Sequence, residues 1–396
     1  MDMTDPAFLR NPRPALETLR NKGALVRGRM PILGKVWFAT DDATCRLILK
    51  SPDLFVRDSA NAGGRPMTRT FWWLPPFVRP LLKSPNQIDG ADHKRLRALV
   101  GQAFSKTGMD ALRPEIETLA DALLDKSPDD LVTGYARPLP VDVICLLLGI
   151  READRPRVAR DSGALGQITG LWSFFRAMPG LWRLTRFFRA ELARLRVEPG
   201  TGLLADMIAA DDNGAQLSDD EILAMSVALF IAGHETTAAL ISGAAAHLLS
   251  HPETADALRK DPALISLFIE EVMRWQSPVY LTNMIFVARK TVLAGQTLQQ
   301  GDKVVPLLIA ANRDANRFDA PWQFDPARRP NPHLGFGHGP HVCIGMQLAR
   351  VEARVALERL LTRFPGASIV GDPDTLPMQR RIGLRGLAAL PVRLRP

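Results

Sequence analysis

The sequence predicts a mainly α fold, built as one large helical domain with a small β-sheet region. Apolar residues recur at helical spacing along most of the chain, whereas β-rich runs are short and come in a few separated pairs. No internal repeat, low-complexity segment or obvious linker divides the sequence. With 396 residues, 46% of them hydrophobic, the chain can bury a large core. We therefore expect a single domain over 1–396, with its β-rich part mainly in 22–40, 280–310 and 366–396.

The individual elements follow from apolar spacing, caps and breakers. Predicted helices cover 13–21, 41–50, 92–105, 109–126, 138–149, 152–162, 174–195, 201–210, 218–250, 252–259, 262–276 and 344–363. The longest helix begins after Ser218, where Glu221 completes a capping-box pattern. Predicted strands cover 25–29, 35–39, 284–288, 303–308 and part of 386–393. Segment 55–90 has little regular pattern and many prolines and aromatic residues, which suggests a lid over an apolar site.

Composition limits the classes of function. Three cysteines without regular spacing are typical of a reducing compartment, and the N-terminal residues lack the apolar run of a signal peptide, so we expect a cytoplasmic protein. The net charge of +8 comes from dispersed arginines without a nucleic-acid motif, which favours an acidic protein partner. The apolar stretch 222–249 is interrupted by His234 and Glu235, so a buried core helix is expected rather than a membrane span.

A single thiol, Cys343, lies in a loop of unusual composition. Residues 336–345 include three glycines and one proline, and a helical pattern starts directly afterwards. Glycines let other groups approach the backbone closely, and a helix N-terminus favours a thiolate. Such a thiolate can be a nucleophile, a zinc ligand together with His338 and His341, or an axial haem ligand. The structural alternative is a buried cysteine after a glycine-rich turn.

Two polar features lie on predicted helices upstream of this loop. Residues 232–237, Ala-Gly-His-Glu-Thr-Thr, place a glycine, a carboxylate and hydroxyls inside the longest helix, where they weaken it. A functional role is one explanation for accepting this loss of helix stability. The structural explanation is that a threonine hydroxyl bonds to the main-chain carbonyl four residues earlier, while Glu235 forms an ion pair. His93 and Arg97, at i and i+4, can hold one anion together or simply belong to a basic helix face.

A third feature, Glu271 and Arg274, has the i, i+3 spacing of a charge pair on one helix face. An exposed pair of this kind is common and contributes little. Together with the Cys343 loop, these motifs resemble those of the cytochrome P450 superfamily, in particular its soluble bacterial-type haem-thiolate monooxygenases. The loop resembles the signature Phe-Gly-x-Gly-x-His-x-Cys-x-Gly, and the matches run in family order from about residue 90 to 345. The resemblance therefore covers essentially the whole chain.

This resemblance implies a cytochrome P450 fold and haem b as cofactor, with Cys343 as the axial thiolate and only metal ligand. The residues that it assigns to cofactor binding are His93, Arg97, Ala232, Gly233, Phe336, Gly337, His341, Cys343 and Gly345. In catalysis, Thr236 would hydrogen-bond dioxygen or its water, and Glu235 would carry protons inward. Glu271 and Arg274 would join Arg328 in a buried structural triad.

One departure from the family pattern concerns the haem propionates. Bacterial members usually carry an arginine after the position of Pro278 that reaches a propionate, and residues 279–286 contain none. The resemblance then leaves His93, Arg97 and His341 for this task, with Asn283 as a further candidate.

The implied reaction inserts one oxygen atom from dioxygen into a hydrophobic organic substrate. Because the chain has no flavin, nicotinamide or iron–sulfur motif, electrons are expected from a separate, acidic ferredoxin or flavodoxin. It would dock on a basic face of Lys94, Arg95, Arg350 or Arg354. The alternatives are a peroxygenase driven by hydrogen peroxide and a non-catalytic haem sensor or carrier.

The substrate itself is not predicted, but candidate pocket residues are. They are Trp72, Leu229, Val279, Leu281, Asn283 and Ile382. Residues 171–189 interleave aromatic residues with arginines, which suits a lid over the substrate entrance or a helix on a membrane surface.

Overall fold

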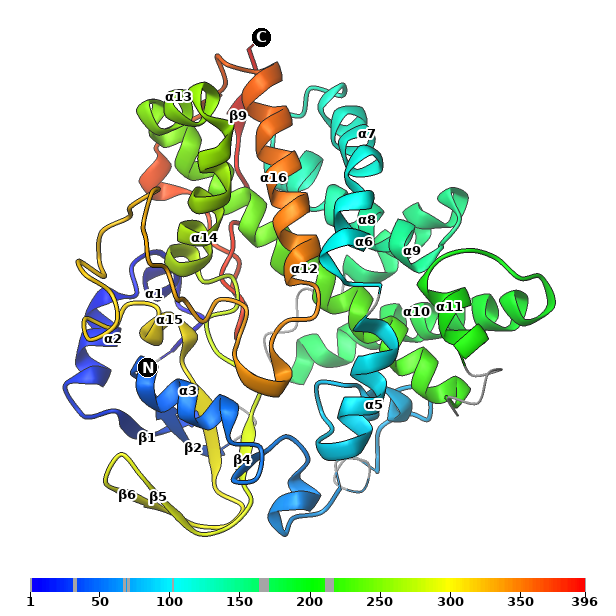
Figure 1. Cartoon of the computed structure of the whole chain (residues 1–396), viewed down its shortest axis with the longest axis vertical. Helices are drawn as coiled ribbons and strands as arrows, with labels where there is room; N and C mark the ends of the chain where they lie inside the picture. The colour runs from blue at the N-terminus through cyan, green and yellow to red at the C-terminus, as the bar shows by residue number, and fades with distance from the viewer. Residues whose placement is uncertain are drawn as a thin grey trace.

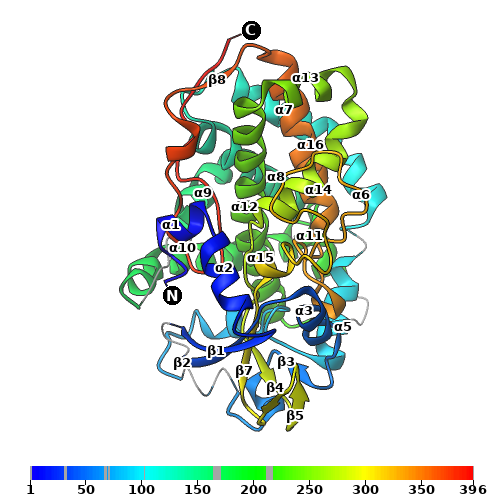
Figure 2. The same ribbon diagram turned by 90° about the vertical axis from the view of Figure 1, so that its left-hand side faces the viewer.

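The computed structural model describes residues 2–30, 34–66, 69, 72–101, 103–163, 171–210 and 217–395. Helices dominate this part of the chain (Figures 1 and 2). Their bounds are α1 Pro6–Arg10, α2 Arg13–Arg20, α3 Asp42–Lys50, α5 Gly90–Gly101, α6 Lys106–Ala111, α7 Arg113–Leu124, α8 Pro138–Leu148, α9 Arg155–Gly163, α10 Leu171–Val197, α11 Leu203–Ala210, α12 Asp219–Ser250, α13 Pro252–Lys260, α14 Ile265–Gln276, α15 Leu308–Ala311 and α16 Met346–Arg363.

The strands are short and form small sheets. Their bounds are β1 Leu25–Met30, β2 Gly34–Ala39, β3 Phe55–Val56, β4 Ile285–Val287, β5 Thr291–Leu293, β6 Gln296–Leu298, β7 Lys303–Pro306, β8 Ser368–Ile369 and β9 Val392–Arg393. The largest sheet has the order β1-β2-β7-β4-β3, in which only the β2–β7 pair is parallel. It lies at one end of the molecule, below the long helices in Figure 1. The predicted mainly helical fold with a small sheet region is confirmed.

Two differences from the predicted elements have local causes. The predicted helix 109–126 is instead α6 followed by α7, because Pro114 has no N–H and fits only the first turn of a helix. The side chain of Ser105 caps α6 by accepting a hydrogen bond from the Gly108 N–H at 3.2 Å. Strands β3, β5, β6 and β8 were not predicted, since two or three residues are too few for an alternating pattern.

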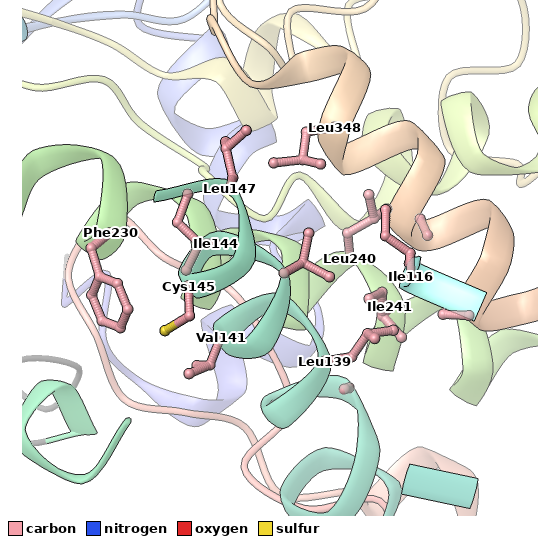
Figure 3. Packing of buried hydrophobic residues seen from close by; sticks show 14 of the residues in the cluster. Ile116, Leu139, Val141, Ile144, Cys145, Leu147, Phe230, Leu240, Ile241 and Leu348 are labelled. Atoms are coloured by element: carbon pink, nitrogen blue, oxygen red, sulfur yellow. The ribbon is translucent and has the colours of Figure 1, made fainter. Parts of the chain in front are cut away.

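Helix α12 runs through the apolar core of the helical part. It packs against α8 and α16, and Figure 3 shows Ile144 and Leu147 of α8 in the same buried cluster as Leu240 of α12. The capping box predicted at its start is present, with the Glu221 N–H bonded to Ser218 Oγ at 3.3 Å and Glu221 Oε2 accepting from the Ser218 N–H at 2.9 Å. By length and composition alone α12 could cross a membrane, but most of its apolar stretch is buried inside the protein. It is the core helix that the sequence predicts.

Candidate functional site

A cavity of about 400 Å³ lies where α12, α5 and the loop before α16 meet. The wall from α12 includes Leu229, Ala232, Gly233 and Thr236. The other walls come from residues 335–345, from α5 and from the segment that follows α14. The site residues predicted from the sequence that line this cavity are His93, Arg97, Leu229, Ala232, Gly233, Thr236, Val279, Leu281, Asn283, Phe336, Gly337, His341, Cys343 and Gly345. Motifs far apart in the sequence thus share one space.

The Cys343 loop is held by its own main chain. The Cys343 N–H donates to the Phe336 carbonyl at 2.8 Å, and the Gly337 N–H donates to the Leu334 carbonyl at 2.8 Å. Gly337 has a φ of +76° and Gly339 a φ of +71°, both in the left-handed region that favours glycine. A Cβ on Gly339 would also lie 2.2 Å from the Leu49 carbonyl oxygen of α3, so no larger residue fits there. The glycines therefore fix where the thiol lies.

The Cys343 thiol opens into the cavity, although protein surrounds it on its other sides. Burial raises the pKa of the thiol. A backbone N–H of Gly345 and the positive charges of Arg97 and Arg350 oppose that rise. These are the donors and charges that would stabilise a thiolate bound to a metal at this position. Within the described part of the chain, no three His, Cys, Asp or Glu side chains are close enough to bind one metal ion. The described residues therefore do not support the alternative of a zinc site at Cys343.

On α12, Thr236 lines the cavity and Glu235 does not. Thr236 Oγ1 donates to the Ala232 carbonyl at 2.7 Å. This is the bond to the main chain that the sequence predicts under the structural explanation for the threonine. Glu235 is paired with Arg381, whose Nη1 lies 2.9 Å from Oε2, and its other oxygen is 3.6 Å from His234 Nε2. Burial opposes ionisation of Glu235, but the neighbouring His234 ring and the charge of Arg381 lower its pKa overall. Glu235 is therefore ionised at neutral pH, and its ion pair with Arg381 holds it outside the cavity lining.

Basic side chains gather at one edge of the cavity. The rings of His93 and His341 lie tilted against each other with their centroids 4.0 Å apart, and Arg97 and Arg57 line the same cavity. Burial, followed by the charges of Arg57, of His93 when it is protonated, and of Arg97, lowers the pKa of His341 to about 3. Burial, followed by the charge of Arg97, also lowers the pKa of His93. Such a cluster favours an anionic group over any cation.

Comparison with known proteins identifies the family of this chain. A sequence model described as Cytochrome P450 matches residues 184–266 and 262–384. The chain belongs to the cytochrome P450 superfamily. It is 36% identical to Vitamin D(3) 25-hydroxylase of Pseudonocardia autotrophica over 405 aligned residues, which cover 100% of this chain and 96% of that protein.

Solved structures agree with this assignment. The P450 PksS of the Bacillus subtilis 168 bacillaene polyketide synthase superposes with a TM-score of 0.90 at 29% identity, covering 100% of both chains. The myxobacterial cytochrome P450 CYP267B1, in complex with myristic acid, has a TM-score of 0.90 at 33% identity, covering 100% of this chain and 99% of that one. The protein is thus an oxygen-incorporating oxidoreductase of a family whose members carry a haem-thiolate cofactor.

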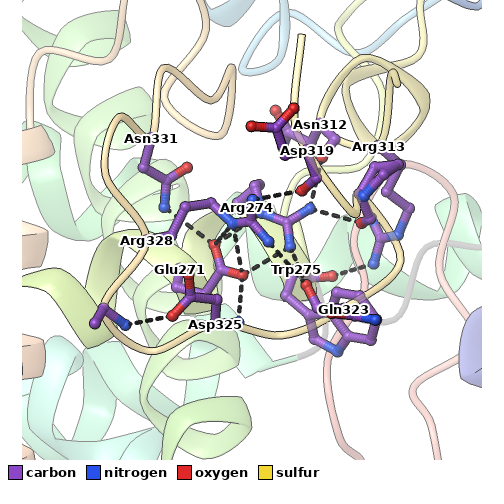
Figure 4. Close-up of polar contacts among 12 residues, drawn as sticks. Glu271, Arg274, Trp275, Asn312, Arg313, Asp319, Gln323, Asp325, Arg328 and Asn331 are labelled. Atoms are coloured by element: carbon purple, nitrogen blue, oxygen red, sulfur yellow. Dashed lines mark hydrogen bonds and ion pairs between the residues drawn. The ribbon is translucent and has the colours of Figure 1, made fainter. Parts of the chain in front are cut away.

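The three residues predicted to form a buried triad, Glu271, Arg274 and Arg328, contact one another outside the cavity (Figure 4). Arg274 contacts Glu271 through two hydrogen bonds of 2.7 and 2.8 Å, and both side chains are fully buried. Arg328 Nε lies 3.2 Å from the same carboxylate. The guanidinium of Arg274 also donates to the main-chain carbonyls of Asn312 and Pro321, each at 2.9 Å. The network ties α14 to the long connection that leads into the Cys343 loop.

Two predicted pocket residues do not line the cavity. Trp72 is 71% exposed, and the structure describes only part of its surroundings, since residues 67, 68, 70 and 71 lie outside the described residues. Ile382 packs instead with the cluster around Tyr280 and Leu281. In α10, whose residues 171–189 were predicted to be a lid or a membrane-surface helix, the described side chains of Phe175 and Trp182 are 48% and 45% exposed.

Sequence reasoning missed two basic residues of this site, Arg57 and Arg381. Arg381 is 146 residues from its partner Glu235, and nothing local in the sequence predicts that contact. Arg57 follows a strand of only two residues, β3, and its sole signal is indirect: the segment after Pro278 has no arginine. Both depend on chain segments that only the fold brings together.

Proposed function

We propose that this P450 inserts one oxygen atom from dioxygen into a hydrophobic organic substrate and reduces the other to water, with electrons from a separate, acidic ferredoxin or flavodoxin. The observation that carries the proposal is that one cavity is lined both by the Cys343 loop and by Ala232, Gly233 and Thr236 of α12. The Cys343 thiol and the Thr236 hydroxyl therefore border the same space.

Haem b fits the residues of this site. Cys343 Sγ would bind its iron, supported by the Gly345 N–H, while His93, Arg97 and His341 would bind its propionates. Phe336 lies on the cavity wall under the Arg350 guanidinium, 4.8 Å from the ring centroid, and would keep water from the sulfur. When bound, haem supplies an iron that activates dioxygen.

Protons would reach the cavity through Glu235 and Thr236. In its resting position the Glu235 carboxylate is held by Arg381, so carrying a proton inward requires that it leave this partner and turn toward the cavity. The Thr236 hydroxyl lines the cavity and would accept the proton through water. Packing does not demand glycine at 233, since a Cβ there would meet only Ile144 at an ordinary 3.5 Å. That tolerance supports a functional reason for the small residue.

The substrate class follows from the apolar lining. Leu229, Val279 and Leu281 border the cavity together with Ile144 and Leu240. The names of the compared proteins mention vitamin D(3), a polyketide and myristic acid, all largely apolar. A binding screen with steroids, macrolides and fatty acids would test this class. Binding is detected by the spectral shift that accompanies displacement of water from ferric haem. A preference for hydrophilic compounds would contradict it.

The basic docking face needs revision in one respect. Arg350 is paired with Glu270 at 2.8 Å and Arg354 with Glu358 at 2.7 Å, so neither contributes a full positive charge to the surface. Lys94 is exposed on α5 and is the better candidate. If an acidic carrier docks here, Lys94→Glu will slow reduction at low ionic strength and the difference from wild type will shrink as salt is added. Equal rates at every salt concentration would refute this docking site.

The decisive first measurement is the absorption spectrum of the reduced protein with carbon monoxide. A strongly red-shifted Soret band reports thiolate ligation, and its absence would contradict the haem-thiolate site. Product formation with a reductase and a ferredoxin then separates a monooxygenase from a sensor or carrier. Equal turnover with hydrogen peroxide alone would favour a peroxygenase instead. We place this reaction in the cytoplasm, where cysteines remain reduced.

A further inference from the structure

Arg57 stands where the sequence lacks the usual propionate arginine. It follows β3, at the opposite end of the sheet from β1, and the residue is 8% exposed. The guanidinium Nη1 donates to the main-chain carbonyl of Asn283 at 3.0 Å. Asn283 belongs to the segment after Pro278 in which family members usually carry their arginine. A residue from the N-terminal part of the chain thus reaches the place that this segment leaves without a cation.

The main chain around Arg57 is fixed by a carboxylate. Asp89 accepts hydrogen bonds from the Arg57 N–H at 2.8 and 3.0 Å and from the Asp58 N–H at 2.9 Å. Because both oxygens of Asp89 hold the main chain, this carboxylate positions the residue and does not pair with its guanidinium. Among the residues that the structure describes, no carboxylate lies within ion-pair distance of the Arg57 side chain.

A buried guanidinium without a carboxylate partner is costly. Burial lowers the pKa of Arg57 to about 10, which the more distant charge of Asp89 only partly offsets. Arg57 also faces other basic groups, since its charge acts on both His93 and His341. Hydrogen bonding to one carbonyl leaves most of the guanidinium donors for another acceptor. An anion at this edge of the cavity would satisfy those donors and offset the repulsion.

We propose that Arg57 binds a haem propionate carboxylate and takes the place of the arginine that is absent after Pro278. The inference rests on the haem site proposed above. A guanidinium can bind a carboxylate through two parallel hydrogen bonds, an arrangement that the planar donor pair of Arg57 allows and a lysine could not reproduce. A carboxylate of a fatty-acid substrate would offer the same chemistry, so the experiment must separate the two sources.

The test compares Arg57→Gln, Arg57→Lys and the control Arg29→Gln, which removes an exposed arginine of β1 in the same sheet. Each holoprotein is mixed with excess apomyoglobin, and the rate of haem transfer is followed by absorbance. Loss of a charge-assisted hydrogen bond predicts about tenfold or faster haem loss for Arg57→Gln. Arg57→Lys should fall between this variant and wild type, while Arg29→Gln should match wild type.

A second readout separates propionate binding from general loosening of the fold. A paired propionate has a lowered pKa, so removal of the Arg57 charge moves the pH-dependent step in the haem reduction potential to higher pH, by about one unit. Arg57→Lys keeps the charge and should leave the step near its wild-type position. Faster haem loss in Arg57→Gln without a displaced step would mean a merely structural role and would overturn the proposal.

The remaining outcomes are also distinguishable. If wild type lacks the red-shifted Soret band of the reduced carbon monoxide form, the haem-thiolate proposal fails before Arg57 is tested. If wild type has this band and Arg57→Gln retains haem as well as wild type does, the propionate assignment is wrong. If that variant also loses the spectral response to myristic acid, the guanidinium serves a substrate carboxylate instead.

Discussion

Glu271→Gln should destabilise this protein strongly, because it removes the only negative charge that Arg274 and Arg328 contact in their buried network, as far as the described residues show. The carboxylate of Glu271 accepts hydrogen bonds from Arg274, Arg328 and Asn331, and it also accepts one from the Asp325 N–H. Neutralising it leaves two arginines, 0% and 9% exposed, without their anion. An uncompensated buried charge of this kind costs about 3–5 kcal/mol of the free energy of unfolding.

The matched control is Asp256→Asn. Asp256 and Arg259 on α13 have the same i, i+3 spacing, but the carboxylate is 62% exposed. An exposed pair contributes about 0–1 kcal/mol, so the control should unfold almost like wild type. Urea unfolding of the haem-loaded proteins, followed by helical circular dichroism, compares the two variants. If Glu271→Gln lost no more stability than Asp256→Asn, the buried network would not hold the Cys343 scaffold as we argue.

Three further predictions concern the thiolate, proton supply and pH. Cys343→Ser should retain the helical circular dichroism signal but lose the red-shifted Soret band and normal monooxygenation; a retained band would exclude Cys343 as the ligand. Arg381→Ala removes a charge that lowers the pKa of Glu235, so the acid limb of the turnover–pH profile should move to higher pH, and an unmoved limb would exclude this pairing from proton supply. Glu270 is partly buried, which opposes ionisation, but hydrogen bonds from His333 and Arg350 lower its pKa from 4.5 to about 2. Because the folded pKa is the lower one, its contribution, at most about 3 kcal/mol, is complete above pH 4.5 and disappears toward pH 2. Glu270→Gln should therefore be less stable than wild type in urea at pH 7, and this difference should shrink to about 1 kcal/mol or less near pH 2.5, whereas a constant difference would refute the linkage.

Much of the site could be predicted because its motifs are local. The glycines around Cys343 are required by main-chain conformation within ten residues, and Ser218 with Glu221 forms its cap inside one turn. Helix pairs such as Glu271 and Arg274 also have fixed spacing. What spacing could not decide was burial, since the same i, i+3 pair is fully buried on α14 and exposed on α13.

By itself, the sequence determined the helical fold class, the cysteine loop and the positions of the motif residues, because each depends on neighbours within a few turns. Only the tertiary structure decided which distant groups meet. It placed Arg381 on Glu235 and Arg57 beside Asn283, across 146 and 226 residues. Such contacts depend on how the small sheet and the C-terminal segment pack against the long helices, and ion pairs leave no periodic trace in the sequence. The same packing paired Arg350 and Arg354 with carboxylates, so the charge of the surface follows from the fold and not from the count of basic residues.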